Sequence, residues 1–210
     1  TDAWYSPALD SPNLLEKNLT LARLMTVVQG SEGAPVLKVG SDQPGGKGST
    51  FYPFFVSAIV AGLVPPFSEF FHAVLRQYNL QALHLHPNSV LLLAIFAYYC
   101  EAHVGVKPSV ALLRHFFSLR VSGAQVFACA SFIIYSSSNA ISKPGKRTEG
   151  YRSKWVMMDV GRLHPWLVLP TGQPKSVDAW SRMELVDPRA KAVLRRMNAD
   201  LRPSNLGAAK

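Results

Sequence analysis

Two long stretches of the sequence, residues 77–100 and 121–142, contain no charged side chain. Each exceeds the roughly 20 residues that a helix needs to cross a bilayer, so each must be buried in a membrane or in a protein core. The first stretch carries Gln, Asn, His and Pro residues in its first half, which leaves only residues 89–100 as a continuous apolar helix. The second contains Gly123, Gln125 and the polar run 136–139, a pattern typical of buried strands joined by a turn. The sequence therefore predicts a globular core and no membrane partner.

The composition fits one domain with arms. The 210 residues are 48% hydrophobic, which excludes wholesale disorder, and only 17% charged, which favours surfaces that bind partners or other copies of the chain. The two cysteines, Cys100 and Cys129, both lie in apolar stretches, so a disulfide framework is excluded. No signal or transit peptide is recognisable, and we expect an intracellular protein, in the nucleus or the cytoplasm, with reduced thiols.

The first fifty residues are expected to form an N-terminal helical arm and a Gly-rich linker. Apolar residues recur at helical spacing over residues 13–28, whereas residues 30–49 have a loop composition. A short helix should follow from Phe51 until Gly62, and residues 67–78 show the clearest amphipathic pattern of the chain.

The next segment predicts a central helix. Residues 88–105 are apolar on all sides between Val90 and Tyr99, with Asn88 as expected N-cap and Gly105 as the stop, so this helix should be buried all round. Another helix is expected from Pro108 to about Arg120.

Strand-like sequence follows, over residues 125–135, 155–160 and 166–169, and residues 187–201 return to helical spacing. The predicted fold class is α+β: a mostly helical core of four to five helices, then a small antiparallel sheet and a C-terminal helix. The expected units are residues 1–50, the core with its sheet over 51–186, and a basic C-terminal helix over 187–210 that begins a truncated region.

The positive charge is concentrated near the C-terminus. The net charge is +9, and residues 143–210 contain 14 basic and 6 acidic side chains, hence +8 of it. Basic residues interleaved with aromatic ones are typical of surfaces that bind single-stranded nucleic acid. The alternative is a solvated loop and an ordinary basic helix face. The candidate nucleic-acid-binding residues are Lys143, Lys146, Arg147, Arg152, Lys154 and Trp155 in one cluster, and Arg189, Arg195 and Arg196, with Lys191 and Arg202, in a second.

The sequence predicts no catalytic residue, no cofactor and no metal. The glycine-rich run 45–50 lacks the order of a phosphate-binding loop. His84, His86, Cys100 and His103 match no standard zinc spacing, which favours a core cysteine and partly exposed histidines. Metal-dependent strand transfer needs about three convergent carboxylates, and only Asp159 occupies a suggestive place.

A family resemblance is carried by the middle of the chain. Residues 60–70 read VAGLVPPFSEF, residues 85–89 read LHPNS, and Cys-Glu-Ala, Gly-Val and Pro-Ser follow in order from residue 100 to residue 109. With the later Lys154-Trp155-Val156, these residues resemble the plant gypsy-type transposon family over about residues 13–200.

The resemblance implies a protein of a plant retroelement or of its remnant in a host genome, and it brings no catalytic residues. The expected function is a non-catalytic module for self-association, nucleic-acid binding, or both, through the basic last third. Two alternatives remain open: a transposase or integrase-like strand-transfer enzyme, and a decayed element copy without activity.

Overall fold

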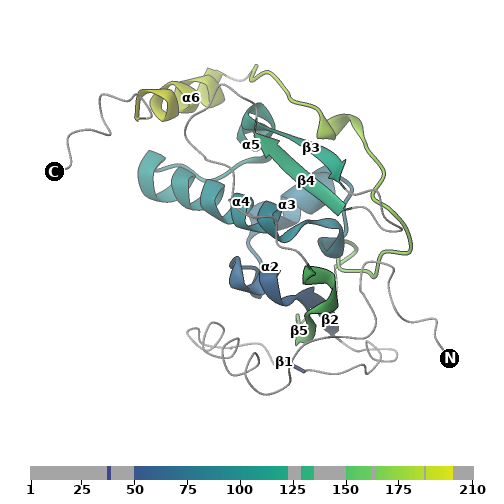
Figure 1. Ribbon diagram of the computed structural model, residues 1–210. Coiled ribbons are helices and arrows are strands. Elements are labelled where there is room, and N and C mark those ends of the chain that lie inside the picture. The colour runs from purple at the N-terminus through teal and green to yellow at the C-terminus, as the bar shows by residue number, and fades with distance from the viewer. Residues whose placement is uncertain are drawn as a thin grey trace.

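The computed structural model describes residues 37–38, 50–122, 129–134, 150–161, 164–186 and 188–200 (Figure 1). Within these residues, helices and antiparallel strands occur together and the C-terminal helix is present, which confirms the predicted α+β class. The helix expected over residues 13–28 lies outside the described residues.

The amphipathic helix predicted over residues 67–78 is present in the helical body. Ser68 caps the amphipathic helix, because its hydroxyl oxygen accepts a hydrogen bond of 3.2 Å from the backbone N–H of Phe71. The helix buries Phe70, Phe71, Val74 and Leu75, as its spacing predicts. The α-helices of the body are α2 (Val56–Val60), α3 (Glu69–Gln77), α4 (Pro87–Tyr98) and α5 (Val110–Phe116).

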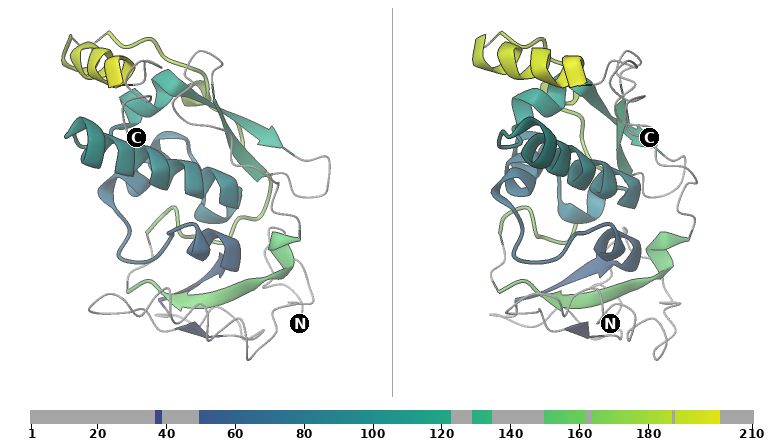
Figure 2. Two further views of the ribbon diagram at one scale, coloured as in Figure 1. Left: turned by 60° about the vertical axis from the view of Figure 1, so that its left-hand side comes forward. Right: turned by 90° about the vertical axis from the view of Figure 1, so that its left-hand side faces the viewer.

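Helix α4 runs through the middle of the molecule (Figures 1 and 2). Its N-cap is His86 rather than the expected Asn88: Nδ1 of His86 accepts a hydrogen bond of 3.1 Å from the backbone N–H of Asn88. Helix α4 continues into a π-helical segment, η2 (Tyr99–Val104), which ends at Gly105 with φ of 71°. A left-handed φ favours glycine, so the predicted stop is confirmed.

Two small antiparallel sheets flank the helices. In the first, β5 (Trp155–Asp159) lies between β1 (Leu37–Lys38) and β2 (Phe51–Phe55), with Phe55 opposite Trp155. In the second, β3 (Phe117–Ser122) pairs with β4 (Cys129–Ile134).

Two local predictions are wrong because segments expected as helix form strands. Residues 51–55 form β2, whose pairing with β5 joins segments about 100 residues apart. Helix α5 ends at Phe116, and β3 follows it directly. Residues 117–122 alternate between apolar and polar types, which suits a strand that buries Phe117 and Leu119 and exposes Arg120.

Two further predictions fail in the connecting segments. Residues 166–169 form turns rather than a strand, with the carbonyl of Trp166 accepting a hydrogen bond of 3.1 Å from the N–H of Ala82. Leu37 and Lys38 lie in the expected loop but pair with β5. Both outcomes depend on contacts with residues distant in the sequence.

Residues 164–186, here called the strap, run along one side of the body from the β5 end to helix α6 (Pro188–Asp200) (Figure 1). The indole Nε1 of Trp180 donates a hydrogen bond of 2.9 Å to the carbonyl of Tyr78, and the N–H of Met183 donates one of 3.0 Å to the carbonyl of Arg114. The strap is therefore hydrogen-bonded to the helical body along its length.

One hydrophobic core joins the helices, both sheets and the strap. Phe96 of α4 lies at its centre, with its ring centroid 5.8 Å from that of Phe70 and 6.0 Å from that of Phe117. Cys100 is buried in this core, and neither Cys100 nor Cys129 forms a disulfide. Among the described residues, no helix has the length and apolar character required to span a membrane.

Candidate interaction surfaces

Helix α6 packs on α5 and η2 through its apolar side. Met197 is buried, Val193 and Leu194 are half-buried, and the hydroxyl of Tyr99 donates a hydrogen bond of 3.3 Å to the carbonyl of Met197. These contacts fix which side of α6 is turned outward.

The outer half of α6 is basic. At about 100° per residue, the basic side chains fall on the part of the helix turned away from its apolar stripe. The helix has one acidic residue, Asp200, at its last position. The sequence-predicted residues Arg189, Arg195 and Arg196, together with Lys191, are all exposed there, and Arg202 lies outside the described residues.

The second predicted cluster is only partly covered by the structure, since Lys143, Lys146 and Arg147 lie outside the described residues. Arg152 is half-buried in the short helix η3 (Tyr151–Ser153), and Lys154 is exposed. Trp155 is completely buried in β5, so its inclusion in the binding surface is corrected: a ring without exposed area cannot stack on a base.

The neighbouring aromatic residue, Tyr151, also packs within the protein. Its ring makes edge contacts with Phe55 and His86, at centroid distances of 4.9 and 5.0 Å. The segment with η3 and β5 lies at the opposite end of the molecule from α6 (Figures 1 and 2). The structure therefore does not bring Arg152 and Lys154 together with the basic half of α6.

Asp159, the carboxylate with the most suggestive sequence position, caps the end of β5. Its Oδ1 accepts hydrogen bonds from the hydroxyl of Thr50 and, at 2.9 Å, from the N–H of Gly161. No group of three or more His, Cys, Asp or Glu residues within the described ranges is arranged to hold a metal ion.

The histidines and cysteine weighed as zinc ligands take part in structural contacts. Nδ1 of His84 accepts a hydrogen bond of 3.0 Å from the N–H of Gln81, and its Nε2 lies 3.2 Å from the carbonyl of Gly172 in the strap. Burial, with a smaller effect of Glu101, raises the pKa of the Cys100 thiol to about 11, so the thiol is protonated at neutral pH. His84 therefore helps to hold the strap against the helical body.

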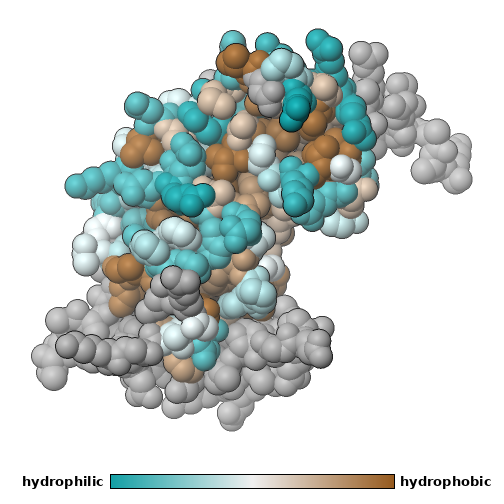
Figure 3. Space-filling model, turned by 180° about the vertical axis from the view of Figure 1, so that it is seen from behind, coloured by the Kyte–Doolittle hydropathy of each residue, from teal (hydrophilic) through white to brown (hydrophobic). Residues whose placement is uncertain are grey.

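Sequence reasoning missed an exposed apolar face on α4, which was expected to be buried all round. Leu91, Ala94, Ile95 and Tyr98 form an exposed ridge, called the α4 ridge, and Tyr98 is 65% exposed. Their spacing of three and four residues places them on one face. A helix that is apolar on all sides gives no periodic signal for which face is exposed. Seen from behind, hydrophilic and hydrophobic residues are interspersed on the surface (Figure 3).

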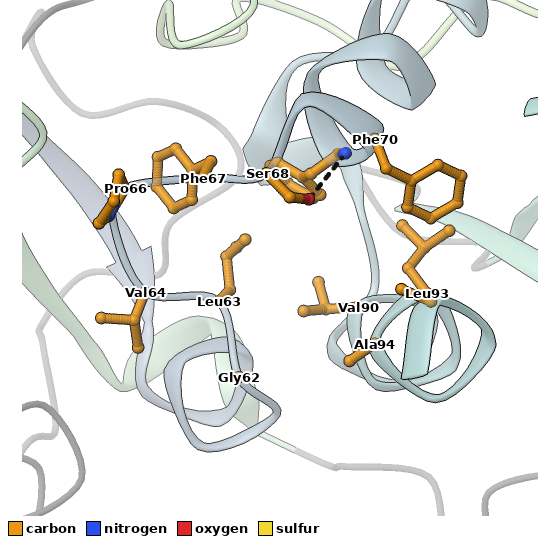
Figure 4. Close-up of a pocket in the computed structure, with 12 residues that line it drawn as sticks. Gly62, Leu63, Val64, Pro66, Phe67, Ser68, Phe70, Val90, Leu93 and Ala94 are labelled. Carbon is orange, nitrogen blue, oxygen red and sulfur yellow. Dashed lines mark hydrogen bonds between the residues drawn. The ribbon is translucent and has the colours of Figure 1, made fainter. Parts of the chain in front are cut away.

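Two hollows border the α4 ridge. One, of about 240 Å³, separates the α2–α3 connection, with Leu63, Val64 and Phe67, from Val90 and Ala94 of α4 (Figure 4). The other, of about 460 Å³, lies between α2 and the start of α4 and is lined by residues including Val60, Leu91 and Lys154. Val60 is 64% exposed, so the apolar surface extends from α4 onto α2.

The helical part of this fold matches a known family model. Residues 54–121, from the end of β2 through the helical body into β3, match the family model described as "Putative gypsy type transposon". No curated protein and no solved structure matches the chain. The match covers the motifs between residues 60 and 109 that carry the resemblance, so it supports a similarity of residues 54–121 to the gypsy-type transposon family.

Proposed function

We propose that this chain is a non-catalytic module of a transposable element that binds nucleic acid through the basic outer half of α6. The observation that carries the proposal is the exposure of Arg189, Lys191, Arg195 and Arg196 on one half of a helix whose other half is anchored to the body. Arginine and lysine at such positions neutralise phosphates and release the counterions condensed on the nucleic acid.

The mode of binding follows from the same residues. No exposed aromatic side chain lies between residues 188 and 200, so contacts to the backbone phosphates dominate over stacking on bases. We therefore expect weak sequence preference and strong dependence on salt. Strand transfer has less support, because the carboxylate of Asp159 is engaged by Thr50 and Gly161.

The test compares two variants that lose the same number of positive charges. In the first, Arg189, Lys191, Arg195 and Arg196 are all replaced by Gln. In the control, four exposed basic residues on the rest of the protein are replaced by Gln, namely Arg76, Lys107, Arg120 and Lys175. Fluorescence anisotropy of labelled single-stranded RNA and of duplex DNA gives the affinity of each protein at low salt.

The α6 variant should lose affinity by about a hundredfold at low salt, and the control should lose much less, because only the first removes a clustered surface. Equal losses in both variants would show that net charge alone governs the interaction. An α6 variant that binds as tightly as the original chain would remove α6 as the binding surface.

A further inference from the structure

The α4 ridge is uncharged as well as exposed. Leu91, Ala94, Ile95 and Tyr98 lie within the 24 residues of the uncharged stretch, residues 77–100, and α2 adds the exposed Val60 beside them. Continuous exposed apolar surfaces on a folded domain mark places where another surface binds. The α4 ridge has no positive charge with which to bind phosphates, so it is a different surface from the one proposed on α6.

The ridge carries a projection and a hollow side by side. Tyr98 projects with 65% of its surface exposed, and its ring packs edge-on against that of His103 at a centroid distance of 5.7 Å, which helps to hold its position. One helical turn earlier, Ala94 lines the hollow of about 240 Å³ opposite Leu63 and Phe67 (Figure 4). Ala94 is therefore part of both the ridge and the wall of this hollow.

A two-fold axis would bring these features together. In a symmetric dimer the same patch is used by both copies, so a residue that contacts a second residue is matched by the reverse contact. Tyr98 and Ala94, which lines the edge of the hollow, lie one turn apart on α4, so each copy offers both a projection and a hollow to the other. We propose that a second copy of this chain docks on the α4 ridge, with Tyr98 of each copy entering the hollow beside Ala94 of the other.

The chemistry of the face favours this occupant over a lipid surface. Helices that lie on anionic membranes carry Lys and Arg along their polar edges, whereas α4 has no basic residue of these types and is followed by the exposed Glu101. An identical uncharged face needs no charged partner and buries apolar area on both sides.

Sedimentation velocity of the full chain, from about 1 to about 100 μM, tests the proposal. The original chain should show a concentration-dependent dimer. Tyr98→Asp removes the projection and Ala94→Phe fills the hollow, and each should weaken the dimer by about thirtyfold or more, as expected for a central contact. Both positions are exposed, so circular dichroism and urea unfolding should match those of the original chain.

Val186→Asp is the matched control, because Val186 is the most exposed of the large hydrophobic residues described and belongs to the strap rather than to the α4 ridge. It should leave dimerisation unchanged. A chain that remains monomeric over the whole range would overturn the proposal, and so would a dimer that Tyr98→Asp leaves intact. This experiment does not involve nucleic acid, so its failure and that of the proposed function are distinguishable.

Discussion

The indole Nε1 of Trp166 donates a hydrogen bond of 2.7 Å to Nδ1 of His72. Nδ1 can accept only while it is unprotonated, so the imidazole of His72 is neutral in this structure. His84 is held in the same way, since its Nδ1 accepts from the N–H of Gln81. Both histidines connect the body to the strap, His72 through Trp166 and His84 through Gly172.

These contacts predict a loss of stability in acid. Burial lowers the pKa of His72, with His164 acting in the same direction, and burial also lowers the pKa of His84. A histidine whose pKa is lower in the folded state binds more protons when unfolded, so its contribution to stability is full above the ordinary pKa of 6.5 and falls as the pH drops below it. The urea midpoint should therefore be lower at pH 5.5 than at pH 7.5.

A variant separates this effect from general acid destabilisation. His72→Asn supplies a non-titrating acceptor near the position of Nδ1, and it should reduce the difference between the two pH values. His103→Asn changes an exposed histidine outside the strap and serves as control. A difference that is the same in all three proteins would contradict the role assigned to His72.

The burial of Trp155 predicts a structural rather than a binding role. Trp155→Ala removes a fully buried ring from β5 and should lower the free energy of unfolding by about 3–5 kcal/mol. Urea unfolding measures this loss. Trp155→Phe, which keeps an aromatic ring in the core, should lose less, and nucleic-acid affinity of the folded Phe variant should equal that of the original chain.

The hydrogen bonds of Asp159 predict a similar outcome at the end of β5. Asp159→Ala leaves the N–H of Gly161 and the hydroxyl of Thr50 without this acceptor, and should lower the free energy of unfolding by about 1–3 kcal/mol. The measurement is again urea unfolding, with Asp178→Ala, at an exposed carboxylate in the strap, as control. Equal stability of the two variants would contradict the capping role.

The second basic cluster gives an independent prediction. Replacing Lys143, Lys146, Arg147, Arg152 and Lys154 by Gln, with Trp155 kept, should weaken polyanion binding without unfolding the core. Since the segment with η3 and β5 lies at the opposite end of the molecule from α6 (Figures 1 and 2), the losses from this segment and from α6 should be additive in free energy. Unchanged affinity in this variant would remove the 143–154 cluster from the binding surface.

Local patterns predicted the elements that are defined by local physics. The spacing of Phe70, Phe71, Val74 and Leu75 predicted α3, and Gly105 predicted the end of the α4–η2 helix. The helical spacing of apolar residues over 187–201 likewise predicted α6. In β3 the alternation of Phe117 and Leu119 with polar residues was present but was assigned to the end of a helix.

Elements that depend on distant contacts could not be read in this way. The pairing of Phe55 with Trp155 creates β2 and buries the indole, and neither segment contains information about the other. The α4 ridge was missed for a different reason: Tyr98 and Phe96 are both large aromatic residues, and only the packing of neighbouring elements leaves one exposed and the other buried.

The salt dependence of nucleic-acid binding by the original chain tests the central claim most directly. Fluorescence anisotropy with labelled single-stranded RNA and duplex DNA, at about 50 and about 200 mM salt, compares affinities across a range in which four phosphate contacts to duplex DNA correspond to a change of about a hundredfold. We predict binding at the lower salt concentration that weakens by at least this factor at the higher one. The absence of binding at the lower salt concentration would contradict the account and make the basic half of α6 a solvated surface.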